Sequence, residues 1–102
     1  MTFNQAEVIN TVNIELSQSS SGTDRYQVPS GRYAVIVINE ASVDGASGSV
    51  RIGDRFSKQG PYKYSEEMGY NTFILNAGDQ IDAASTGDTA LISGFALEYN
   101  QV

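Results

Sequence analysis

The chain has 102 residues and a net charge of −6, so we expect a single domain over residues 1–102 without room for a second core. Histidine, cysteine and tryptophan are absent, which excludes Ser-His-Asp and Cys-His nucleophiles, disulfides and zinc sites made of Cys and His. The acidic balance disfavours nucleic acids and anionic membranes as partners, because both carry negative charge.

The apolar residues favour strands over helices. Val and Ile together number sixteen, against four Leu, and β-branched residues suit a pleated, half-buried surface. Ten glycines are spread along the chain, which is typical of short strands joined by tight turns. No apolar stretch approaches the roughly 20 residues of a membrane span, and the N-terminus has no secretory signal pattern.

The predicted elements run in chain order as short strands between turns. Alternation predicts a strand over 7–16, in which Asn10 interrupts the apolar face without breaking the register. Serines and a glycine predict a loop over 17–24. Further strands are predicted at 25–28, 32–39, 49–53, 71–75, 80–83 and 89–99; residues 54–57 continue or pair back, and 59–70 form the longest irregular segment.

These segments make about eight short strands and predict an all-β fold, an antiparallel β-sandwich of jelly-roll-like form. The strand 32–39 is apolar on both faces, which indicates a central strand covered on both sides. We expect the second sheet on one side and a neighbouring subunit on the other. In the turns 28–31 and 76–79 we expect positive φ angles at Gly31 and Gly78.

Carboxylates are the first candidates for chemistry. Aspartates offer the oxygen ligands of a calcium site, but the EF-hand spacing is absent and Asp residues at turns commonly cap them. We therefore predict turn caps and leave a surface calcium ion open, and no cofactor is expected. The adjacent pair Glu66 and Glu67 would point to opposite sides of an extended chain, which does not suit glycoside hydrolysis. The aspartates considered are Asp44, Asp54, Asp79, Asp82 and Asp88.

Two other groups of residues are weighed in the same way. The segment 86–89, Thr-Gly-Asp-Thr, resembles an aspartic-protease loop only in composition, and we interpret it as a turn. The four arginines are dispersed along the sequence, and we expect each to pair with a nearby carboxylate. They are Arg25, Arg32, Arg51 and Arg55.

Three tyrosines, Tyr62, Tyr64 and Tyr70, lie close together in the irregular segment. They could cover one open end of the sandwich or anchor a protein interface, and stacking on sugar rings is a third possibility. With Phe3, they are the candidate interface residues of the chain. No catalytic residue is predicted.

Three stretches resemble the small β-sandwich proteins of tailed-phage virions, which include capsid decoration (cement) proteins and knob domains of tail fibres. They are Val28-Pro29-Ser30-Gly31-Arg32-Tyr33, Phe73 to Ile81 with its Asn76-Ala77-Gly78-Asp79 turn, and Ile92-Ser93-Gly94-Phe95. In that family the second turn reads Leu-Pro-Ala-Gly-Asp, so Asn76 replaces the expected proline.

The resemblance implies a structural virion protein without enzymatic activity. It would bind and stabilise the shell through the major capsid protein or another virion protein. The apolar strand 32–39 and the modest core separately favour a homo-oligomer, a trimer or another small ring, with the trimer favoured. The absence of a stalk favours a stand-alone decoration protein, and we expect the polar arm 1–6 to contact the shell. The alternative is a receptor- or carbohydrate-binding knob of a tail fibre or another cell-surface recognition module.

Overall fold

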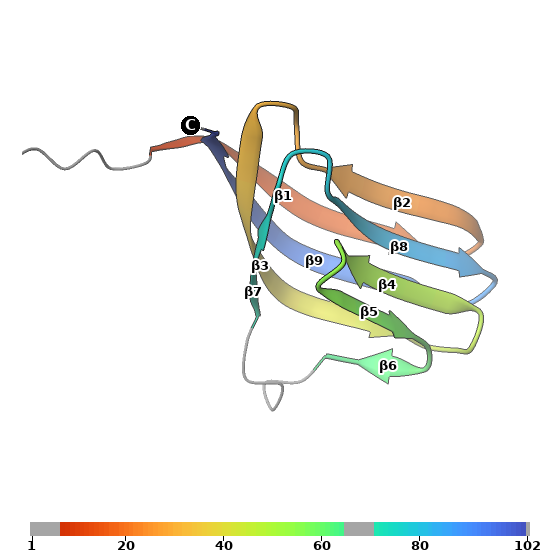
Figure 1. The fold of residues 1–102 in the computed structure, drawn as a ribbon. Coiled ribbons are helices and arrows are strands. Elements are labelled where there is room, and N and C mark those ends of the chain that lie inside the picture. Colours follow the sequence, from red (N-terminus) through yellow and green to blue (C-terminus); the bar gives the residue numbers. More distant parts are fainter. Residues whose placement is uncertain (1–6, 65–70, 102) are drawn as a thin grey trace, which may run out of the picture.

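The computed structural model describes residues 7–64 and 71–101, and every regular element in them is a strand (Figure 1). The candidates Phe3, Tyr70, Glu66 and Glu67, together with the arm 1–6, lie outside the described residues. The strands are β1 (Val8–Gln18), β2 (Ser21–Gln27), β3 (Arg32–Val43), β4 (Gly48–Ile52), β5 (Phe56–Gln59), β6 (Tyr62–Lys63), β7 (Thr72–Leu75), β8 (Gln80–Thr86) and β9 (Ala90–Asn100).

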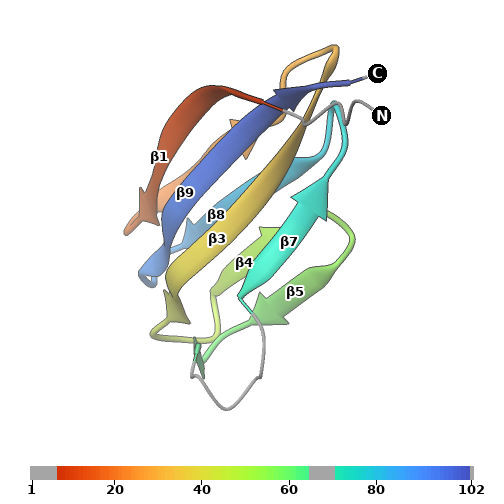
Figure 2. The ribbon, with the colours of Figure 1, turned by 90° about the vertical axis from the view of Figure 1, so that its left-hand side faces the viewer.

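The strands form two antiparallel sheets that pack as a sandwich. The five-stranded sheet has the order β1-β9-β3-β6, with β7 also paired to β3, and the four-stranded sheet has the order β2-β8-β4-β5. Figure 2 shows β1, β9, β3 and β7 in front of β8, β4 and β5. The predicted all-β sandwich is confirmed, with nine strands where about eight were expected. The jelly-roll connectivity stays a prediction. Among the described residues there is no helix that could cross a membrane.

The core lies between the sheets and follows the period of two. On β3, for example, Ala34, Ile36 and Ile38 are at most 1% exposed, while the residues between them face outward. The same alternation runs along β9, and on β8 Ile81, Ala83 and Ser85 are buried, although Asp82 between two of them is also only 7% exposed. The largest fully buried apolar side chains are Ile14, Ile36, Ile38, Ile52, Leu75, Ile81, Ile92, Val28, Val43 and Val50.

Two predicted irregular segments contain strands. The expected loop 17–24 is a tight connection at residues 19–20, because β1 continues to Gln18 and β2 begins at Ser21. Residues 17–18 pair with β9 and residues 21–24 pair with β8. Their polar side chains are compatible with strand structure because strand pairing uses backbone hydrogen bonds. Within 54–57, Phe56 and Ser57 pair back on β4 as the start of β5, while residues 54–55 form the turn, and β6 lies within the segment 59–70.

The turns 28–31 and 76–79, which carry most of the resemblance, are hydrogen-bonded to each other. The Val28 N–H donates to the Asp79 carbonyl at 2.9 Å, and the Gly78 N–H donates to the Val28 carbonyl at 3.0 Å. The two stretches therefore meet at one end of the sandwich.

The expected backbone of the two turn glycines is confirmed. Gly31 has a φ of 78° and Gly78 a φ of 87°, in the left-handed region that glycine adopts without steric cost. Nothing lies within 4 Å of a Cβ atom built at either position. A side chain there would meet only backbone strain, which makes both sites a clean test of the turn geometry.

Replacing Gly31 or Gly78 with Val should lower the free energy of unfolding by about 1 kcal/mol or more, because a β-branched residue is strained at positive φ. Urea denaturation measures the change. Gly87→Val is the matched control: Gly87 has no positive φ, and the nearest atom to its added Cβ is 3.8 Å away. A loss in the control as large as in the two turn variants would contradict the argument.

Candidate functional site

The outer face of the five-stranded sheet is apolar where it crosses β3. Tyr33, Val35 and Val37 alternate with the fully buried Ala34 and Ile36, so they point away from the core. They are half-buried, and no described strand packs over them. The sequence predicted that this strand is covered on both sides, and the four-stranded sheet covers its inner side as expected. The neighbouring subunit expected on its outer side stays a prediction.

Neighbouring strands continue this apolar surface. Leu97 of β9 lies beside Val35, and Val35 lies beside Ile74 of β7, which is 58% exposed. At one end, the rings of Tyr33 and Tyr99 stack with centroids 5.1 Å apart and planes 9° from parallel. Figure 2 views the strands that carry these side chains from the outer side. We call the set the apolar face: Tyr33, Val35, Val37, Ile74, Phe95, Leu97 and Tyr99.

The outer face of the four-stranded sheet has the opposite character. Arg25 of β2, Asp82 of β8 and Arg51 of β4 lie side by side in one row. The Asp82 carboxylate accepts hydrogen bonds from Arg25 Nε and Arg51 Nη2, both at 2.6 Å. Both arginine side chains are about half exposed, at 48% and 50%. One sheet therefore presents a polar outer face of the kind expected in water, and the other does not.

The structure places two of the predicted interface tyrosines. Tyr62 and Tyr64 are half-buried and pack against the sandwich core. The Tyr62 ring lies 5.7 Å from that of Phe56, and the Lys58 ammonium lies 5.9 Å from its centroid. This arrangement matches the interpretation that the tyrosines cover an end of the sandwich. The interface role of Phe3, Tyr62, Tyr64 and Tyr70 stays a prediction.

Of the predicted turn caps, Asp79 caps its own turn, and Asp44 and Asp88 each accept a backbone N–H from another turn. The prediction is wrong for Asp82, which lies in β8 and pairs with two arginines. Asp44 accepts the Thr89 N–H at 2.7 Å, and Asp79 accepts the Asn76 N–H at 2.8 Å. Asp88 accepts the Ser47 hydroxyl at 2.7 Å and the Ser47 N–H at 2.9 Å, and these hydrogen bonds lower the pKa of its carboxyl. No group of three or more acidic side chains gathers as a metal site within 7–64 and 71–101.

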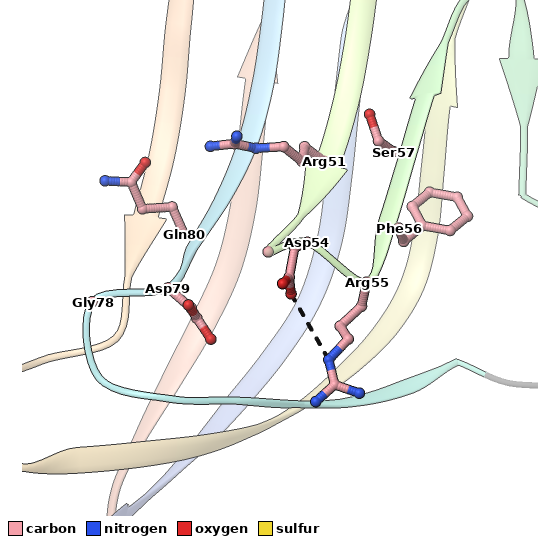
Figure 3. Close-up of a pocket in the computed structure, with 9 residues that line it drawn as sticks. Arg51, Asp54, Arg55, Phe56, Ser57, Gly78, Asp79 and Gln80 are labelled. Atoms are coloured by element: carbon pink, nitrogen blue, oxygen red, sulfur yellow. Dashed lines mark ion pairs between the residues drawn. The ribbon is translucent and has the colours of Figure 1, made fainter.

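A hollow opens beside the β4–β5 hairpin and the 76–79 turn (Figure 3). It has a volume of about 480 Å³ and is open to solvent on one side. Two guanidiniums and two carboxylates line it, and Arg55 Nε lies 3.9 Å from Asp54 Oδ1. Phe56, Ser57 and Gln80 are among the other lining residues, and the Phe56 ring itself packs against Tyr62 and Phe73. Donors and acceptors of this kind suit a small polar ligand more than an apolar one.

The sequence did not single out Glu98, yet this carboxylate lies inside the sandwich at 1% exposure. It accepts hydrogen bonds from Asn10 Nδ2 of β1 at 3.0 Å, from the Tyr26 hydroxyl of β2 at 2.5 Å and from Arg32 Nη1 of β3 at 2.7 Å. Tyr26 belongs to the four-stranded sheet, so this cluster joins the two sheets through polar contacts.

The protonation states of this cluster follow from its contacts. Burial raises the pKa of Glu98, but hydrogen bonds from Tyr26, Asn10 and Arg32 and the charge of Arg32 outweigh burial, so the pKa lies below its usual value. Burial, the bond to Glu98 and the charge of Glu98 raise the pKa of Tyr26. Glu98 is therefore ionised and Tyr26 protonated at neutral pH. Glu98 does not line the hollow, and we assign it a structural role.

Comparison with protein-family models, with curated proteins and with solved structures finds no match to this chain. The resemblance to phage virion proteins therefore stays a prediction that rests on its three sequence stretches.

Glu98→Gln should lower the free energy of unfolding at pH 7 by about 2 kcal/mol, because Arg32 and Tyr26 lose a charged acceptor. The folded-state pKa of Glu98 lies below the unfolded value of about 4.3, so its stabilisation is present above that pH and is lost as the pH falls through the folded pKa. Urea denaturation at neutral and acidic pH should show that the free energy of unfolding falls less on acidification in the variant than in the wild type.

Glu40→Gln is the matched control, because Glu40 is an exposed carboxylate on the neighbouring strand β3. We expect it to change the free energy of unfolding by less than about 0.5 kcal/mol. Equal pH dependence in the wild type and in Glu98→Gln would contradict the assignment of Glu98.

Proposed function

We propose that this protein is a structural subunit that docks onto another protein through the apolar face, and that it serves as a capsid decoration protein of a phage virion. The observation that carries the docking proposal is the row of half-buried apolar side chains on an outer sheet surface. Water-exposed faces of antiparallel sheets are normally polar, as the Arg25–Asp82–Arg51 row of the second sheet is. Contiguous exposed apolar patches mark interaction sites.

The virion assignment is supported by the three sequence stretches. The turns 28–31 and 76–79, which belong to two of them, are hydrogen-bonded into one end of the sandwich. We propose the major capsid protein or another virion protein as partner, with assembly on the shell. The homo-oligomer, with a trimer favoured, and the contact of the arm 1–6 with the shell are parts of the same proposal.

The second candidate is recognition of a receptor or carbohydrate, and the hollow favours it. Arg51, Arg55 and Gln80 offer donors there, and Asp54 and Asp79 offer acceptors. Such a mixture matches a polyhydroxylated ligand. The two candidates use different surfaces, so variants on each surface separate them.

Ile74→Glu should weaken attachment at least about tenfold, a loss of about 1.4 kcal/mol, because a carboxylate would be desolvated within the contact. Ile74 is 58% exposed, so the fold should tolerate the change. The measurement is cosedimentation of the chain with capsids assembled without a decoration protein.

The matched control is Thr86→Glu, which adds the same charge at an exposed position of β8 on the other sheet. It should bind like the wild type. Attachment that Ile74→Glu leaves unchanged would remove the apolar face from the proposal. If the intact chain fails to cosediment with any capsid, carbohydrate recognition becomes the leading candidate, and a glycan array with Arg55→Ala tests it.

We also propose that the protein has no catalytic activity, since the chain lacks His and Cys and its buried Glu98 is held by three donors. The purified protein should release no product from peptide, ester or glycoside substrates. Turnover that persists through further purification and is abolished by a single Asp or Glu substitution would contradict this.

A further inference from the structure

We propose that β1 is a self-association edge, which pairs antiparallel with β1 of a second copy and joins the two five-stranded sheets. β1 lies at the end of its sheet and pairs with β9 on one side only. From Asn10 to Gln18 this pairing is regular, since the one register shift lies between Val8 and Asn10. No described strand lies on the other side.

One hydrogen bond identifies which backbone groups of β1 point away from β9. The Ser17 N–H donates to Asp24 Oδ2 at 3.1 Å, so it points away from β9. Because successive residues of a strand alternate in direction, the N–H and C=O groups of Thr11, Asn13 and Glu15 face the same open side. These three residues present the unpaired part of the edge.

A single carboxylate limits this open part at one end. While Asp24 Oδ2 accepts the Ser17 N–H of β1, Asp24 Oδ1 accepts the Arg25 N–H of β2 at 3.1 Å. The edges of both sheets are thus capped by one side chain. The other end is limited by the register shift at residues 8–10, which leaves residues 11–15 as the open stretch.

The side chains of β1 do not protect this edge. Its sequence, VINTVNIELSQ, has no Lys, Arg or Pro, and its single charge is Glu15. Natural edge strands are commonly blocked by lysine, proline, bulges or short length. By contrast β5, an edge of the other sheet, has four residues, one of which is Lys58.

The second copy is the occupant because the open stretch is complementary to itself. Around a two-fold axis at Asn13, Thr11 lies opposite Glu15 of the second copy, and Asn13 lies opposite its own equivalent. All three open residues are then paired, with a hydroxyl facing each carboxylate. An axis at Thr11 would place Glu15 opposite Glu7, and an axis at Glu15 would place two glutamates together, both of which are unfavourable.

The same register improves packing on the inner side of the strand. There the half-buried Val12 lies opposite Ile14 of the second copy, so its remaining exposed surface is reduced. The pairing is independent of what binds the apolar face, and it predicts a dimer of the free chain in place of the trimer favoured from the sequence. A trimer in solution would contradict it.

The test is sedimentation equilibrium of the full chain at concentrations up to about 1 mM, where weak but specific pairing is still detected. The wild type should form a dimer. Asn13→Lys places two lysines at the axis and should raise the dissociation constant at least about tenfold. Asn13→Asp, which keeps the size of the side chain, should act in the same direction if the lysine variant does not fold.

Thr23→Lys is the matched control, because Thr23 is an exposed residue on the edge strand β2 and gains the same charge. It should leave the dissociation constant within about threefold of the wild type. In amide exchange followed by NMR, the N–H groups of Thr11, Asn13 and Glu15 should become protected as the concentration rises, and that of Thr23 should not. A monomer throughout, or equal effects of Asn13→Lys and Thr23→Lys, would overturn the proposal, as would pairing with a different protein only.

Discussion

A buried negative charge holds the two sheets of this protein in a fixed relation. Isolated in the core, the Glu98 carboxylate would cost several kcal/mol, so it is retained only where donors surround it. Asn10, Tyr26 and Arg32 supply those donors from three strands and from both sheets. A shift of any of these strands by one residue would turn its donor away from the carboxylate. The cluster therefore fixes the register that also sets which residues form the apolar face.

That register gives the two sheets different outer surfaces. The alternation that buries Ala34 and Ile36 turns Val35 and Val37 outward. Because these residues are also apolar, the outer side of β3 is apolar too. On β8 the same alternation turns Asp82 outward to meet its two arginines. The outer face of the five-stranded sheet is therefore apolar and that of the four-stranded sheet polar. This difference is the reason for assigning contact with a partner to the five-stranded sheet.

Much of this could be predicted from the sequence, because period-two alternation is a local signal. The sandwich, the turn glycines and the two-faced strand 32–39 are of this kind. Polar partners far apart in the chain were harder to predict. Asn10 interrupted one apolar face, and Glu98 shared the face of Ala90, Ile92, Gly94 and Ala96. Each is a polar residue at an inward position, and this is the signal by which the pair could have been found. Their pairing required the register of β1 on β9, in which Asn10 lies opposite Glu98.

The open edge of β1 and the apolar face belong to the same sheet, which links the two proposals physically. Two sheets joined edge to edge by a two-fold axis keep equivalent outer faces on the same side only if the axis is perpendicular to the sheets. Antiparallel pairing around Asn13 has such an axis, so the apolar faces of both copies would point the same way. Two weak contacts on one partner surface then act together, and avidity would raise attachment without any new contact within either copy. A modest apolar face could in this way support firm binding to a repetitive surface such as a shell.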